Sequence, residues 1–235
     1  MKGIDQFQVI TTDRLYVKIA EQLRGLIEAG VYNPGDRFPA ERALAEKLGV
    51  SRPTIREAMI ALEISGIIEI RTGSGIYVSD KKSVSAPLLT DKGIGPFEIL
   101  EMRYALEPEI CALAAVRITD EQIERLNQII KDMEEEEKQP DSSEKADGEF
   151  HMLIAEASQN SAMYQSVKWL WELRNKSVLS DSFLKVIREE GVHPSIDDHK
   201  KIASALAQRN PERALVAMKN HIDNATVNAA GHFEK

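Results

Sequence analysis

Three histidines and one aspartate in the C-terminal half of the chain have the types and spacing of a metal site. Asp147 and His151 lie four residues apart in DGEFHMLIA, so both side chains project from one face of the expected helix. His199 begins the segment HKKIASALA, and His221 lies among the apolar positions of the last helical segment. This donor set suits a borderline divalent ion such as zinc, nickel or manganese, with one or two coordination positions left open.

A single histidine of this kind is more often a hydrogen-bonded core residue than a ligand, so the prediction depends on the four residues together. Such a cluster serves a ligand-binding site, a metal-dependent enzyme or a purely structural ion. No separate general base has a defined place beside the four residues, which favours a protein that is not an enzyme.

A second set of functional residues is the group of arginines in residues 37–56, RFPAERALAEKLGVSRPTIR. The stretch predicts two short helices joined by a tight turn at residues 48–51, with a small apolar core and with Arg42, Arg52 and Arg56 on the outside. In a helix-turn-helix the first helix supports the second one in the major groove of DNA. This spacing therefore indicates DNA binding.

The neighbouring segments predict a winged form of this motif. An apolar stripe predicts a supporting helix over residues 13–30, and residues 67–72 and 76–78 alternate like strands around a GSG tip. A glycine-rich tip lets the backbone approach a partner closely, so Arg71 and Gly73 are placed to contact the minor groove or a phosphate.

The remainder of the chain predicts a second, helical domain. Residues 80–95 lack periodicity and have the composition of a linker, and the segments beyond them carry helix caps such as Thr119 and Asn210. The fold class is therefore mainly α. A winged helix-turn-helix of three helices plus a small hairpin occupies residues 1–79, and an all-α antiparallel bundle of six or seven helices occupies residues 96–235.

Composition restricts the class of protein further. The 235 residues carry a net charge of -8, which does not by itself favour DNA binding, although residues 37–56 concentrate positive charge. Cys111 is the only cysteine and is expected to be a buried thiol. No apolar run approaches a bilayer-spanning length, so we expect a cytoplasmic protein that does not contact a membrane.

The segment from Gly30 to Val78, which contains RFPAERALAEKLGVSRPTIREAM and EIRTGSGIYV, closely resembles the winged helix-turn-helix of the GntR family of bacterial transcription regulators. The resemblance implies that double-stranded operator DNA is the partner. It implies that the following residues of the helix-turn-helix contact DNA: Arg42, Ser51, Arg52, Thr54 and Arg56. Gly73 is the implied contact at the wing tip, and Arg37 and Arg71 are two further candidates.

The spacing of Asp147, His151, His199 and His221 also resembles the metal-binding pattern of the FCD effector domain, found in the FadR subfamily of GntR regulators. That resemblance implies a homodimer and a small organic acid bound beside the metal, for which zinc is the first choice. Arg103 matches an inward arginine that pairs with the acid; a surface ion pair with Glu107 is the alternative. Arg174 and Asn175 are further pocket candidates.

Within this subfamily, RLYVKIAEQLRGLIEAGVY and EIRTGSGIYV are most similar to regulators of hexuronate catabolism. The similarity implies a repressor that leaves a palindromic operator when a hexuronate or a derivative binds. A regulator of another hydroxy-acid pathway, such as that of lactate or gluconate, or one with a purely structural metal, remains the alternative.

Overall fold

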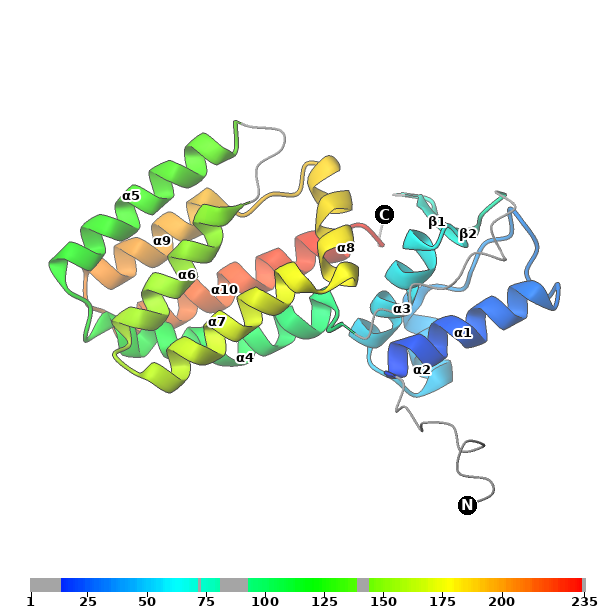
Figure 1. Ribbon diagram of the computed structural model, residues 1–235, viewed down its shortest axis with the longest axis horizontal. Coiled ribbons are helices and arrows are strands. Elements are labelled where there is room, and N and C mark those ends of the chain that lie inside the picture. The colour runs from blue at the N-terminus through cyan, green and yellow to red at the C-terminus, as the bar shows by residue number, and fades with distance from the viewer. Residues whose placement is uncertain (1–13, 72, 81–92, 139–143, 234–235) are drawn as a thin grey trace, which may run out of the picture. The chain divides into compact units, whose positions relative to one another are not determined.

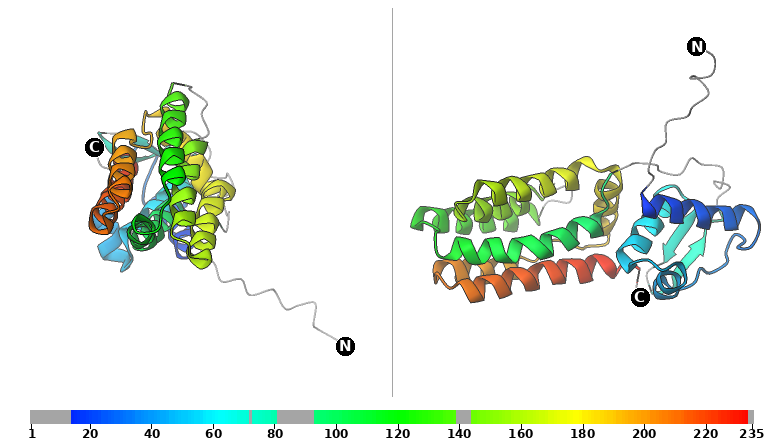
Figure 2. Two further views of the ribbon diagram at one scale, coloured as in Figure 1. Left: turned by 90° about the vertical axis from the view of Figure 1, so that its left-hand side faces the viewer. Right: turned by 90° about the horizontal axis from the view of Figure 1, so that it is seen from below.

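This computed structural model describes residues 14–71, 73–80, 93–138 and 144–233. They divide into two compact units: the first holds residues 14–69 and 76–80, and the second holds residues 93–138 and 144–233, with which residues 70, 71 and 73–75 of the hairpin are grouped. Figures 1 and 2 show the elements. In chain order, the described elements are α1 (Leu15–Glu28), α2 (Glu41–Leu48), α3 (Arg52–Ile64), β1 (Ile68–Arg71), β2 (Gly75–Val78), α4 (Pro96–Ala115), α5 (Asp120–Glu136), α6 (Lys145–Ala157), α7 (Ser161–Lys176), α8 (Val178–Glu189), α9 (Ile196–Ala207) and α10 (Pro211–Ala230).

The first unit is the predicted winged helix-turn-helix, in which α1 and α2 both pack on α3. The turn between α2 and α3 depends on Gly49, whose φ of 67° is a left-handed conformation that glycine adopts without steric cost. Ser51 then caps α3 by accepting a hydrogen bond from the amide of Thr54, and Pro53 occupies the first turn. The strands β1 and β2 pair as the hairpin. Three helices and a wing are thereby confirmed.

The second unit is the predicted all-α bundle, and its described residues form seven helices. The helices α4 and α10 lie along one another for most of their length, and α5 packs on α6 and α9 (Figures 1 and 2). The shorter α8 runs across the end of the bundle (Figure 1). The helix caps predicted from sequence are present: Thr119 and Gln122 form a capping box, and Asn210 caps α10.

The domain boundaries at residues 79 and 96 stay predictions, because residues 81–92 of the predicted linker lie outside the described residues. Among the described helices, none is both long and apolar enough to cross a membrane. Cys111 is fully buried, as expected.

The core of the bundle is built by apolar side chains from α4, α5, α6, α9 and α10. Leu206 is fully buried there, whereas Val216 on α10 is 53% exposed. We expect Leu206→Ala to lower the free energy of unfolding by about 2–5 kcal/mol, because it removes buried contacts and leaves a cavity. The matched Val216→Ala variant should change it by less than about 0.5 kcal/mol. Urea denaturation followed by circular dichroism measures both, and equal effects would contradict this packing.

Candidate metal centre and ligand pocket

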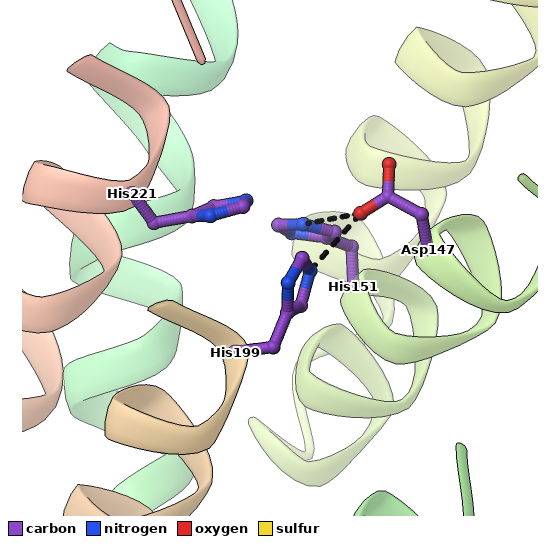
Figure 3. A group of neighbouring side chains, drawn as sticks. All are labelled: Asp147, His151, His199 and His221. Carbon is purple, nitrogen blue, oxygen red and sulfur yellow. Dashed lines mark hydrogen bonds and ion pairs between the residues drawn. The ribbon is translucent and has the colours of Figure 1, made fainter. Parts of the chain in front are cut away.

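The structure brings the four predicted metal ligands together in the interior of the bundle. Asp147 and His151 come from α6, His199 from α9 and His221 from α10 (Figure 3). One potential ligand atom from each of the four lies within 4.8 Å of all the others, and all four residues are buried. Helical segments far apart in sequence therefore converge on one buried set of nitrogen and oxygen donors.

The hydrogen bonds of His199 show that the set fits a cation. Its Nδ1 lies 2.8 Å from the carbonyl oxygen of Ser195, to which it donates a proton. In the neutral ring Nε2 then carries a lone pair, yet this atom lies 3.0 Å from Asp147 Oδ1 (Figure 3). Two electron-rich atoms at this distance need a shared proton or metal ion between them. His221 Nδ1 is also buried, and no described residue gives it a hydrogen-bond partner.

His151 is oriented by a carboxylate that the metal prediction did not include. Its Nδ1 lies 2.5 Å from Glu107 Oε2, so the carboxylate is the nearest acceptor for a proton on this nitrogen. Its Nε2 lies 3.6 Å from Asp147 Oδ1. Carboxylates that hold the outer nitrogen of a metal-binding imidazole fix its tautomer and ring orientation. Glu107 therefore directs the lone pair of His151 into the cluster.

The pKa shifts of His151 and His221 favour neutral imidazoles, and those of Glu107 and Asp147 favour ionised carboxyl groups. Burial lowers the pKa of His151 and lowers that of His221 well below 6.5. Burial alone would raise the pKa of Glu107, but Arg103 and His151 outweigh it and lower the pKa to about 2. The pKa of Asp147 is likewise far below its usual range because the close contact with His199 and nearby positive charges outweigh burial. These are the protonation states that metal ligation requires.

A pocket opens directly beside the cluster, and Asp147 and His221 are part of its lining. Its other charged residues include Arg103, Arg174 and Arg188. Glu144 pairs with two of these arginines: its Oε2 lies 2.7 Å from Arg174 Nη2, and its Oε1 lies 3.1 Å from Arg188 Nε. The pocket thus combines a potential metal site with an excess of guanidinium groups, the arrangement that binds a small anion.

Trp171 contacts two of the pocket arginines. The guanidinium of Arg103 lies 4.5 Å from the ring centroid and that of Arg174 lies 4.9 Å from it. Cation–π contacts of this kind hold a guanidinium in a fixed plane. The indole is buried against α6, where a Cβ at Gly148 would come within 3.3 Å of the ring, whereas Trp169 is half exposed.

The structure corrects two expectations about the ligand pocket. Asn175 is exposed and is not one of the pocket residues, because it lies on the outer side of α7. The ion pair between Arg103 and Glu107 exists at 2.7 Å, but it is buried and belongs to the site instead of the surface. Sequence reasoning missed several polar lining residues from other elements, for which no spacing signal was available: Glu144, Arg188, Ser195, Asn224 and Asn228.

Most candidate DNA-contacting residues lie on the surface of the first unit. Arg37, Arg42 and Arg71 are exposed, and Arg42 makes only an exposed ion pair with Glu46, at 3.1 Å. Gly73 is exposed at the hairpin tip, with a φ of 83°. These positions are compatible with DNA contact, which stays a prediction for each residue.

The N-terminus of α3 supplies the other candidates. The Oγ of Ser51 and the Oγ1 of Thr54 lie 2.7 Å apart at the first turn, where helix amides favour a phosphate. Arg52 is 49% exposed at its side chain, and its Nε bonds to Glu41 Oε1.

Arg56 differs from the expectation that it lies outside. Its side chain is only 8% exposed, and its Nε donates to Glu41 Oε2 at 2.7 Å. Glu41 on α2 therefore holds both Arg52 and Arg56 of α3, one with each carboxylate oxygen. The prediction that Arg56 lies outside was wrong. It was made from the amphipathic pattern of α3 alone, and this pattern does not reveal that a carboxylate on α2 pairs with the arginine.

Comparison with known proteins identifies both units. Residues 15–78 match the bacterial regulatory proteins of the gntR family, and residues 98–224 match the FCD domain. The chain is 37% identical to the Uxu operon transcriptional regulator of Escherichia coli, over 91% of this chain and 86% of that protein. It is 35% identical to the Exu regulon transcriptional regulator of the same species, over 91% and 84%. Among solved structures, Streptococcus agalactiae GntR is 33% identical, with 91% of this chain and 100% of that chain covered and a TM-score of 0.46.

The buried cluster makes stability depend on pH. The folded-state pKa values of His151 and His221 lie below 6.5, so the unfolded chain takes up protons at higher pH than the folded one. The contribution of these neutral histidines to the free energy of unfolding is complete above the pKa of the unfolded chain. It is lost as the pH falls through the pKa values of the folded protein. We therefore expect the thermal midpoint of chelator-treated protein to fall between about pH 7.5 and about pH 5. His221→Gln should flatten this slope, whereas His193→Gln, at a partly exposed position, should not. A midpoint that rises on acidification would contradict the assignment.

Proposed function

Because this chain belongs to the GntR family of transcription regulators and carries an FCD domain, we propose that it represses a sugar-acid operon and leaves its operator when a small carboxylate binds beside a metal ion. It is a DNA-binding transcriptional regulator of the Uxu and Exu type. The observation that carries the proposal is the arginine-rich pocket that opens onto Asp147 and His221.

The proposed ligand is a hexuronate or a derivative, as the Uxu and Exu relatives suggest. Asp147, His151, His199 and His221 would hold the ion, which would supply a Lewis-acidic centre for an oxygen of the acid. Arg103 and Arg174 are the groups that pair with the carboxylate, because a guanidinium matches a carboxylate with two parallel donors.

The uncharged polar side chains of the pocket are suited to hydroxyl groups. Ser195, Asn224 and Asn228 line the same space as the arginines. Asn224 is fixed by its own hydrogen bond, in which Nδ2 donates to Asp198 Oδ2 at 2.8 Å, so its carbonyl oxygen has a defined direction. A pocket with fixed amides and guanidinium groups favours a polyhydroxy acid over an apolar one.

Operator binding, as proposed, requires two copies of the chain. A homodimer presents two α3 helices to half-sites about one helical turn, or roughly 10 bp, apart on a palindromic operator. The bound acid changes operator affinity only through different affinities for the DNA-competent and DNA-incompetent forms of the dimer. Repression followed by release is the direction we propose.

The carboxylates around the pocket argue against the alternative of a metal-dependent enzyme. A general base needs a carboxylate or imidazole within reach of the reacting group. Glu107 is committed to Arg103 and His151, and Glu144 to Arg174 and Arg188. This pairing favours binding over turnover. A regulator of another hydroxy acid would use the same metal ligands and arginines. Only a comparison of different acids in the binding experiment distinguishes this alternative from a hexuronate regulator.

The effector proposal is tested by operator release. We expect D-glucuronate, D-galacturonate or their keto isomers to displace the zinc-loaded protein from promoter DNA of its own operon, measured by fluorescence anisotropy. The same acids should have no effect on Asp147→Asn protein, whose operator affinity without acid should stay within about 3-fold of wild type, since the substitution is in the helical unit and not in α3. Operator binding that is unaffected by every acid in the presence of zinc would contradict the proposal.

The DNA-contact prediction is tested on Arg52. We expect Arg52→Ala to weaken specific operator binding by about 10- to 100-fold, because one arginine contact to a base contributes about 1–3 kcal/mol. Arg125→Ala is the matched control, since it removes the same charge from an exposed arginine of α5 that pairs with Glu149 at 3.4 Å. Equal losses in the two variants would mean that only net charge matters.

A further inference from the structure

We propose that Arg103 competes with the metal ion for a single atom, His151 Nε2, so that Arg103 turns to the acid only in the metal-loaded protein. Metal binding then has to precede acid binding. The acid half of this inference rests on the function proposed above, whereas the competition for His151 is independent of it.

The contact that suggests the competition is 3.1 Å long and joins Arg103 Nη2 to His151 Nε2. Arginine has donors only, so Nε2 must accept and must carry the lone pair of a neutral imidazole. The close approach of Nδ1 to Glu107 Oε2, at 2.5 Å, favours a ring proton on Nδ1 and therefore the same tautomer. The two contacts of His151 are therefore consistent with one protonation state.

The same lone pair is the one that a metal ion needs. An imidazole nitrogen has one lone pair in the plane of its ring, so His151 Nε2 serves either Arg103 or a metal ion. Nε2 also lies on the side of the ring that faces Asp147, at 3.6 Å from Oδ1. Ligation at this atom obliges Arg103 to give up its contact with His151.

Arg103 has a pivot on which it can turn. Its Nε donates to Glu107 Oε1 at 2.7 Å, and its guanidinium lies over the face of Trp171. Neither contact involves His151, so the guanidinium can rotate within its own plane about the Nε contact, still stacked on Trp171, while Nη2 changes partner. Arg103 also lines the pocket, where a carboxylate is the natural acceptor for the released donor. By linkage, an acid that binds Arg103 then also strengthens metal binding.

Zinc affinity tests the competition directly. Chelator-treated wild-type protein and Arg103→Lys protein are titrated with zinc against a chromophoric chelator. Lysine keeps the positive charge near Glu107 but lacks the fork that reaches two partners. We expect Arg103→Lys to bind zinc about 10-fold more tightly than wild type, which is the effect of removing one charge-assisted hydrogen bond from the competing state.

Arg174→Lys is the matched control, because Arg174 lines the same pocket and also lies over the ring of Trp171. Its zinc affinity should stay within about 2-fold of wild type. Arg103→Met provides a second test if the lysine variant folds poorly, and it should also bind zinc more tightly. An unchanged or weaker zinc affinity in the Arg103 variants, or equal gains in Arg103→Lys and Arg174→Lys, would overturn the proposal.

Trp171 reports the turn of Arg103 independently. The chain has two tryptophans, so Trp169→Phe leaves Trp171 as the only indole. We expect zinc alone to change the fluorescence of this protein, and we expect at least half of that change to disappear when Arg103→Lys is added. A zinc response that is the same with and without Arg103 would contradict the proposed turn.

The order of binding is tested with D-galacturonate as the probe. Calorimetry should detect binding of this acid to zinc-loaded protein and not to chelator-treated protein, and binding of equal strength to both would refute the metal-first order.

The two proposals can be contradicted separately. If zinc affinity and fluorescence change as expected but no acid binds or releases DNA, the proposed function is wrong and the competition stands. If acids release the operator but Arg103→Lys leaves zinc affinity unchanged, the competition is wrong.

Discussion

The interior of the C-terminal unit depends on how Asp147 is accommodated among three buried imidazoles. A buried carboxylate is costly unless cations or donors surround it, and Asp147 lies 3.0 Å from an imidazole nitrogen whose partner nitrogen is already committed to a backbone carbonyl. A shared cation resolves this arrangement. Since the donors come from α6, α9 and α10, the same cation would join three helices that also carry the apolar core. Metal binding at this cluster would therefore be coupled to folding of this unit.

Carboxylates that each contact two basic side chains recur at the candidate functional parts of both units. Glu41 holds Arg52 and Arg56, Glu107 holds Arg103 and His151, and Glu144 holds Arg174 and Arg188. Long arginine side chains lose much conformational entropy when they bind a ligand. A carboxylate that restrains the arginine beforehand reduces this cost, because the side chain is already ordered. The shared carboxylates are thus as much a part of each site as the groups that meet DNA, metal or acid.

Sequence reasoning predicted the features that follow from periodicity and local spacing. The helix-turn-helix, the wing, the helical bundle and the shared face of Asp147 and His151 were predictable because caps, apolar stripes and a four-residue interval have local causes. The structure groups these two residues with His199 and His221, as expected, and their role as metal ligands stays a prediction. The family resemblance identified Arg103. The i,i+4 spacing of Arg103 and Glu107 suggested a surface pair equally well, because spacing does not reveal which face of α4 is buried.

Other parts of the site depend on tertiary packing and had no sequence signal. Arg188 reaches the pocket because α8 crosses the end of the bundle, and Arg56 is buried because Glu41 approaches from α2. The prediction that Asn175 lines the pocket failed because it also depends on tertiary packing. Arg174 lines the pocket, whereas Asn175, the next residue along α7, is exposed.

The central claim is that the four ligands hold a metal ion beside which the acid binds. X-ray absorption at the zinc edge of zinc-loaded protein, with and without D-galacturonate, tests it most directly. The account predicts nitrogen and oxygen neighbours only, the multiple-scattering pattern of three imidazoles, and a change in the oxygen shell when the acid is added. A sulfur neighbour, fewer imidazoles, or a spectrum that is unchanged by an acid that releases the operator would contradict it.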